Sequence, residues 1–123
     1  MSENIDFYPE GCPPSDAYCH DQYVYLFARN NPPLLEDTYT AYEKGTFKKK
    51  DPCQRKSLSC GIELDYLDSI QKLFPVTNGW LRVKAEIDCK DGVLKQTNSN
   101  LYHHSLWLDV IIRKTFYTRL EVM

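Results

Sequence analysis

The chain has 123 residues, of which 42% are hydrophobic and 26% charged, and its formal net charge at pH 7 is −2. These values predict one globular domain with its own core and argue against a largely disordered chain. They also argue against a membrane protein, since no apolar run approaches the ~20 residues that a membrane helix needs.

The cysteines and the first residues predict where the protein works. Five cysteines are an odd number, without the density of a disulfide scaffold, so we expect mostly reduced thiols. Residues 1–22 lack the charged start and apolar middle of a signal peptide. Both features predict a cytoplasmic protein.

Charge is distributed unevenly along the chain. Residues 1–43 carry eight acidic residues against Arg29, whereas residues 44–56 carry six basic residues against Asp51. A solvated loop is the favoured interpretation of this basic segment. Nucleic-acid binding through it is the less favoured one, because no Arg- or Lys-rich helix follows.

The N-terminal part predicts an irregular arm and then a strand. Residues 1–21 are rich in Pro, Gly, Ser and Asp, although their three aromatic side chains can pin the arm to the body. A single α+β domain is expected over residues 22–123. Its first strand, 22–29, is apolar on both faces and therefore predicts an internal position in a sheet.

The next segments predict two helices that flank a short strand. Residues 32–45 begin with Pro-Pro, carry acids in the first turn and end at Lys-Gly, which are the signals of one helix. Residues 57–64 predict a strand in which Gly61 marks a bulge or the close approach of another group. Residues 65–75 predict a second helix, with Asp65 as its N-cap and an approximate capping box.

The C-terminal half predicts antiparallel strands. Residues 80–89 alternate apolar and charged side chains, as a strand with one wet face does. Asp91-Gly92 predicts a hairpin turn into residues 93–97, and residues 115–122 predict a final strand. The fold class expected from this order is α+β, a curved and mostly antiparallel sheet of about five strands with two helices.

Two adjacent histidines precede a tryptophan in the C-terminal half. If residues 101–108 are extended, His103 and His104 face opposite sides, so regular geometry cannot direct both into one site. A structural role is favoured for at least one of them, and the other is the best candidate for a proton carrier.

No metal site is predicted. Cys12 and Cys19 are seven residues apart, as are Cys53 and Cys60, and this spacing misses the two to four intervening residues usual between zinc ligands. Phosphate-binding glycine loops, the serine nucleophile elbow and the His-Glu-x-x-His helix motif are also missing.

The order of motifs over residues 22–110 resembles that of a group of small uncharacterised bacterial proteins. The resemblance rests on the Pro-Pro helix, the Ser-Leu-Ser strand at residues 57–59 and the His-His-x-x-Trp element. It implies a shared fold and a bacterial origin, and it implies no activity.

The chain is also similar, more faintly, to the minimal ADP-ribosyltransferase plan. The matching residues are Arg29 at the end of the first strand, Ser57 and Ser59 in the second, and Glu121 near the C-terminus. The similarity implies that the arginine holds the NAD pyrophosphate, a serine orders the ribose and the carboxylate stabilises the transition state. Arg119 departs from the pattern, because a Glu or Gln is usual two residues before the glutamate.

Together these features predict a small binding or regulatory module with a protein partner and no cofactor. Its expected contact residues are His103, His104, Trp107, Tyr39 and Tyr42. The first alternative is an NAD-consuming enzyme, and the second is nucleic-acid binding through residues 44–56. Ligand identity and oligomeric state are not predicted.

Overall fold

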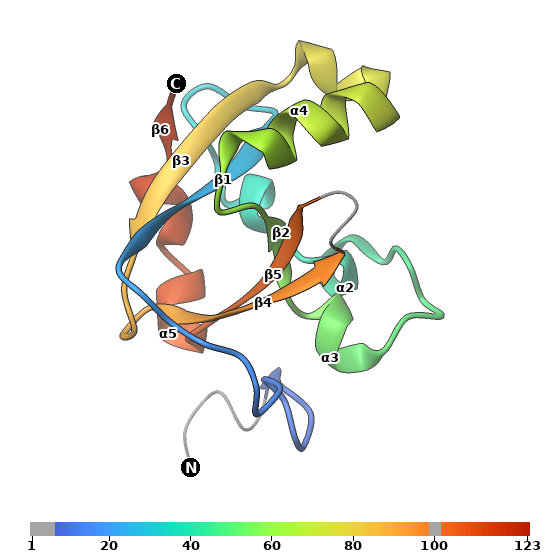
Figure 1. Ribbon diagram of the computed structural model, residues 1–123, viewed down its shortest axis with the longest axis vertical. Coiled ribbons are helices and arrows are strands. Elements are labelled where there is room, and N and C mark those ends of the chain that lie inside the picture. The colour runs from blue at the N-terminus through green and yellow to red at the C-terminus, as the bar shows by residue number, and fades with distance from the viewer. Residues whose placement is uncertain (1–6, 99–101) are drawn as a thin grey trace.

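The computed structural model describes residues 7–98 and 102–123 (Figure 1). The fold class is α+β, as predicted, but the strands form two antiparallel sheets of three strands each, with orders β1-β3-β6 and β2-β5-β4. Neither sheet is strongly curved. The strands of the described residues are β1 (Gln22–Ala28), β2 (Leu58–Cys60), β3 (Leu81–Ile87), β4 (Gly92–Asn98), β5 (His103–Leu108) and β6 (Glu121–Val122).

Short helices fill the connections between the strands. Of the α-helices in the described part of the chain, only α4 exceeds one turn, and it lies beside β1 and β3 in Figure 1. The α-helices are α2 (Ala41–Lys44), α3 (Pro52–Arg55), α4 (Leu64–Leu73) and α5 (Val110–Arg113). The 3-10 helices are η1 (Leu35–Thr38), η2 (Pro75–Gly79) and η4 (Phe116–Arg119).

The main core lies where the apolar faces of the two sheets meet. In the first sheet, Val24 and Leu26 of β1 are buried together with Val83 of β3. Leu94 and Leu106 supply the facing side from the second sheet. Alternating burial along β1 and β3 therefore follows the period of two that a half-buried strand requires.

Within the described residues, a single bridge joins the two sheets. The backbone groups of Tyr25 and Gly61 exchange hydrogen bonds of 2.8 and 2.9 Å. β1 is thus an edge strand of its sheet, and the predicted internal position is wrong. Because β1 and β2 share only this bridge, they do not continue as one sheet, which is why a single five-stranded sheet was also wrong.

The predicted hairpin at Asp91-Gly92 does not form. β4 pairs with β5 and not with β3, so the turn carries the chain from one sheet to the other. The Asp91 carboxylate accepts a hydrogen bond from the Asp88 amide and binds Arg119 at 2.8 Å. These contacts attach the turn to η4, which contains Arg119, and β3 and β4 do not pair across the turn.

The predicted helix over residues 32–45 divides into η1 and α2. Tyr39 and Thr40 between them are extended, and Thr40 forms a capping box with Glu43 that starts α2 afresh. The stop signal was correct, since Gly45 ends α2 with a φ of 70°. Residues 52–55, predicted as loop, form α3 because the Asp51 carboxylate accepts a hydrogen bond from the Gln54 amide.

Helix α4 is confirmed, although its predicted cap is wrong. It begins at Leu64, with Glu63 in the N-cap position and no side-chain capping bond. The strand predicted over residues 115–122 is confirmed only as β6, since Phe116–Arg119 form η4 around the fully buried Phe116.

Two disulfides overturn the prediction of reduced thiols. Cys12 pairs with Cys53 and Cys19 with Cys89, and the buried Cys60 is the one free thiol among the cysteines, all of which lie in the described ranges. Both bonds attach the N-terminal arm to the body. Tyr8 adds a hydrogen bond of 2.6 Å from its hydroxyl to the Leu108 carbonyl.

Candidate functional site

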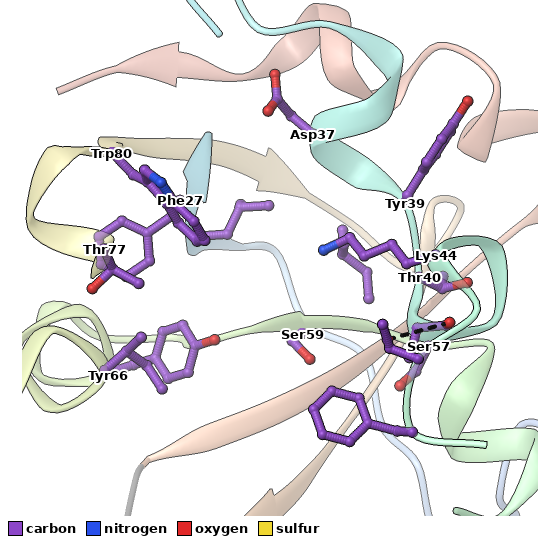
Figure 2. A pocket seen from close by; sticks show the side chains of 16 residues that line it. Phe27, Asp37, Tyr39, Thr40, Lys44, Ser57, Ser59, Tyr66, Thr77 and Trp80 are labelled. Carbon is purple, nitrogen blue, oxygen red and sulfur yellow. Dashed lines mark hydrogen bonds between the residues drawn. The ribbon is translucent and has the colours of Figure 1, made fainter. Parts of the chain in front are cut away.

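One cleft of the described structure is formed by two adjoining cavities of about 200 and 510 Å³. It lies on the side of the Tyr25–Gly61 bridge where β1 runs toward Arg29 and β2 begins. Both cavities share five lining residues, and Figure 2 shows the smaller one. The shared residues are Phe27, Asp37, Tyr39, Lys44 and Trp80.

Asp37 attaches the η1 wall of the cleft to the end of β1. Its carboxylate accepts hydrogen bonds of 2.8 Å from the backbone amides of Arg29 and Leu34. The Asn30 side-chain amide donates to the same carboxylate and also to Glu36. The Asp37 carboxylate is therefore already engaged in structural hydrogen bonds, and several donors surround its negative charge.

An aromatic wall faces this arrangement. Trp80 lies just before β3, with its ring 6.4 Å from that of Phe27 in an edge-on contact. The Arg29 guanidinium lies 5.3 Å from the centre of the Trp80 ring. Stacking of this kind covers one face of the guanidinium and leaves its N–H edge able to bind an anion.

Lys44 supplies a second cation. In Figure 2 its amine points into the cavity, and within the described residues it makes no hydrogen bond or ion pair. Lys44 belongs to the single turn α2, whose capping box fixes its backbone. The cleft is lined by two cations, Arg29 and Lys44, and by two carboxylates, Asp37 and Glu36, beside an aromatic wall.

Hydroxyl groups line the floor of the cleft. The Ser57 hydroxyl is occupied, because it donates to the Gln54 carbonyl at 2.7 Å. The hydroxyls of Ser59 and Tyr66 make no hydrogen bond within the described residues, and the Tyr66 hydroxyl points toward Ser59 in Figure 2. Burial raises the pKa of Tyr66, so this phenol stays protonated and can donate a hydrogen bond at neutral pH.

The structure brings together four of the nine predicted site residues in the cleft. Arg29, Ser57, Ser59 and Tyr39 all line the cleft. Glu121 does not, because β6 pairs with the edge of β3 that faces away from β1.

Glu121 lies too far away to act in the cleft. It is opposite Lys84, four strand residues from Trp80, which is about 13 Å along β3 at ~3.3 Å per residue. The three matched positions of the transferase plan therefore do not converge on one cleft.

The two histidines lie on opposite faces of β5, as predicted, and neither lines the cleft. The His103 ring packs against Tyr66, and its Nδ1 lies 2.6 Å from the Thr97 hydroxyl. Burial, with Lys50 and His104 adding to it, lowers the pKa of His103 to about 4. Burial also lowers the pKa of His104, which is 6% exposed. Both rings are neutral at pH 7, so neither gives the surface a charge.

Trp107 is a core residue, so its prediction as a contact residue of the surface is wrong. It is 3% exposed, and its indole N–H donates to the Cys53 carbonyl at 2.9 Å. Tyr42 is exposed, yet Lys56 and Arg55 lie against its ring. The disulfide at Cys53 explains the burial of Trp107, because it draws the N-terminal arm over this face.

The basic segment 44–56 is not one continuous cationic face. Lys44 lines the cleft, Lys50 covers the Phe47 ring, and the Lys56 amine donates to the Phe7 carbonyl at 2.6 Å. Arg55 donates to the Thr46 carbonyl. These contacts support the prediction of an ordinary loop more than that of a nucleic-acid surface.

Sequence reasoning missed Trp80, Lys44 and Tyr66. Gly61 was the available signal for Tyr66, because a Cβ atom at Gly61 would lie 2.2 Å from the Tyr66 Cβ. The predicted close approach to Gly61 is therefore made by Tyr66, the residue that lines the cleft beside Ser59.

Among the described residues no three His, Cys, Asp or Glu side chains are grouped to hold a metal ion, and no helix is long and apolar enough to span a membrane. Comparison of the chain with protein-family models, with curated proteins and with solved structures finds no match. The two resemblances noted above thus stay untested.

Proposed function

We propose that the protein is a binding module and that its recognition site is the cleft between Arg29, Lys44 and Trp80. The ligand that fits these walls carries a flat ring beside an anionic group, as a nucleotide does. The ring stacks on the aromatic wall, and the anion lies between the guanidinium and the amine. The observation that carries this proposal is the convergence of two cations and the Trp80 ring on one cleft.

The hydroxyls of the floor support the same ligand class. Ser59 and Tyr66 can bind the hydroxyl groups of a ribose, because both are unoccupied within the described residues and face the cavity. Small-molecule sites usually combine an apolar wall with a few polar groups that fix orientation. The cleft has both an aromatic wall and polar groups, and these belong to different elements of the fold.

An NAD-consuming enzyme is the alternative that one observation favours, because Arg29, Ser57 and Ser59 share the cleft. The observation against it is the position of Glu121. Asp37, the carboxylate common to both cavities, already accepts hydrogen bonds from two backbone amides. We therefore propose recognition of NAD-like ligands without turnover, and incubation with NAD should release no nicotinamide in either the parent protein or Glu121→Gln.

Calorimetric titration with ADP, adenosine and inorganic pyrophosphate tests the proposed binding. ADP should bind more tightly than either part alone, since only ADP engages both the aromatic wall and the cations. Arg29→Gln and Lys44→Gln should each weaken ADP binding roughly tenfold, as expected for the loss of one charge-assisted contact.

Lys48→Gln is the matched control, because Lys48 is an exposed lysine of the same basic segment that does not line the cleft. It should bind ADP as the parent does. Equal weakening in all three variants would show that ADP responds only to the total charge of the segment, and the proposal would then be wrong.

We also infer that the protein works in an oxidising compartment. The cytoplasmic prediction rested on expected reduced thiols and on the missing signal-peptide pattern in residues 1–22, whereas four of the five cysteines form disulfides. Stable disulfides of this kind are typical of secreted and periplasmic proteins and rare in the cytosol.

A further inference from the structure

A second cavity, of about 350 Å³, lies beyond the Tyr25–Gly61 bridge. Ile62 and Glu63, which directly follow the bridge along the chain, form part of its wall, whereas Ser57 and Ser59, which precede Gly61, line the cleft. The two hollows share no lining residue. The second cavity is therefore a separate candidate site, and its volume is within the range of small-molecule pockets.

The walls of this cavity are aromatic and carry negative charge. Tyr18 and Tyr102 contribute rings, and Gln96 and His104 contribute polar groups. Glu63 is the one charged residue among its six described lining residues, because burial lowers the pKa of His104 and keeps its ring neutral. Aromatic faces beside a carboxylate attract a cation and repel an anion.

Glu63 has no structural task that would occupy its carboxylate. It holds the N-cap position of α4 without making a capping hydrogen bond, and it forms no ion pair within the described residues. Its carboxylate is therefore available to a bound cation.

His104 and Gln96 supply hydrogen-bond acceptors to the same cavity. The His104 Nδ1 lies 3.5 Å from the Tyr102 carbonyl, and opposite a carbonyl it can act only as a donor. In a neutral ring this leaves Nε2 as an acceptor. The Gln96 amide oxygen is a further acceptor, so the cavity suits a cation that carries N–H groups.

Tyr102 is held in a conformation that most residues avoid. Its φ of 54° is in the left-handed region, which costs a non-glycine residue on the order of 1 kcal/mol. The ring that this conformation places at the cavity is half exposed. Strain of this kind clusters at ligand sites, where a side chain must be presented at a fixed position.

We propose that this cavity binds a guanidinium or primary ammonium group. The cation lies against the Tyr18 and Tyr102 rings, pairs with Glu63 and donates to His104 Nε2 or Gln96. A free amine and the Arg or Lys side chain of a protein partner share this chemistry, and the experiment separates the two sources.

The test is an NMR titration of the ¹⁵N-labelled protein with N-acetyl-arginine-N-methylamide and with its neutral citrulline analogue, which has the same shape. The amide signals of Glu63, Gln96 and His104 should shift with the arginine compound. The citrulline compound should bind at least roughly tenfold more weakly, a difference of about 1.4 kcal/mol. Methylguanidine distinguishes the two sources of the cation, because it carries the guanidinium group without the peptide groups. An affinity equal to that of the arginine compound indicates a free amine, and a much weaker affinity indicates the Arg or Lys side chain of a protein partner.

Glu63→Gln should weaken binding of the arginine compound roughly tenfold, and Tyr102→Leu should weaken it without changing the charge. Glu86→Gln is the matched control, because Glu86 is an exposed acid on β3 that does not line the cavity. Equal binding of the arginine and citrulline compounds, or no saturable shift, would overturn the proposal. The outcome is independent of ADP binding, since the cleft and this cavity share no residue.

Discussion

At the scale of single residues, the wall of the cleft at Tyr66 depends on Gly61. Gly61 exchanges backbone hydrogen bonds with Tyr25 while the Tyr66 side chain packs directly on its Cα. Any side chain at position 61 would collide with the Tyr66 Cβ, an atom that cannot rotate away. The need for a glycine could be recognised from the sequence, but its contact with Tyr66 could not, because this contact depends on how the chain turns from β2 into α4.

Gly61→Ala should destabilise the protein by roughly 1–3 kcal/mol, as overpacking of a closed contact does. The added Cβ would lie 2.2 Å from the Tyr66 Cβ, so the helix or the strand must move. Gly79→Ala is the control, since nothing lies within 4 Å of a Cβ at that position. Urea denaturation of both variants measures the difference, and equal stabilities would contradict the account of Gly61.

His103 should make the stability of the protein depend on pH. Its pKa is lowered to about 4 by burial, with Lys50 and His104 adding to the effect, whereas an unfolded chain has a His pKa of about 6.5. The unfolded chain therefore binds the proton more tightly. The stability contributed by the neutral ring is complete above about pH 6.5 and is lost as the pH falls toward 4.

His103→Gln removes this titration, so its free energy of unfolding should fall less steeply than that of the parent between about pH 6.5 and 4. Denaturation series at several pH values measure the two slopes. Identical slopes would show that the imidazole titrates alike in the folded and unfolded chain.

At the scale of elements, hydrophobic period predicted β3 and α4, whose apolar positions recur on one face. It did not predict β5 as a strand, because the residues from His104 to Leu108 are buried on both faces. The helix predicted over residues 32–45 failed for a local reason. Asp37 and Thr40 form hydrogen bonds with nearby backbone amides, and these bonds compete with a continuous helix. The hairpin at Asp91-Gly92 failed because pairing partners are chosen by the tertiary structure, which a turn motif does not contain.

Asp37→Ala should loosen η1 from β1 and lower the stability by about 1–2 kcal/mol, in the range seen when a capping carboxylate is lost. The amides of Arg29 and Leu34 would lose their acceptor. ADP binding should weaken as well, since Tyr39 of the cleft wall follows η1 directly. Glu36→Ala is the control for stability, because Glu36 is exposed and within the described residues its carboxylate accepts a hydrogen bond only from the Asn30 side chain; equal losses of stability in both variants would contradict this role of Asp37.

At the scale of the whole molecule, the α+β class could be predicted from the sequence, but its division into two sheets could not. The division depends on long-range contacts, chiefly the one-residue bridge at Tyr25 and the disulfides that close over residues 12–53 and 19–89. Cysteine spacing alone allows many pairings. The candidate site could be predicted only in part for the same reason. Arg29 directly follows β1 and Ser59 lies within β2, so local sequence was enough to single them out, whereas the positions of Glu121 and Trp107 depend on strand pairing and on the N-terminal arm.

The disulfide between Cys12 and Cys53 should contribute substantially to stability. Replacing both residues by Ser should cost roughly 2–4 kcal/mol, because the bond closes a long loop in the unfolded chain. Protein denatured without reductant should also show one reactive thiol, that of Cys60. A count of three or five thiols in air-oxidised protein would contradict the pairing described here.

The indole N–H signals of the two tryptophans test the central claim most directly, because Trp80 lines the cleft and Trp107 is buried on Cys53. In an NMR titration with ADP, the Trp80 signal should shift and saturate while the Trp107 signal stays in place. Arg29→Gln should move the midpoint to higher ADP concentration. A stationary Trp80 signal at saturating ADP, or equal shifts of both signals, would show that the cleft is not the recognition site.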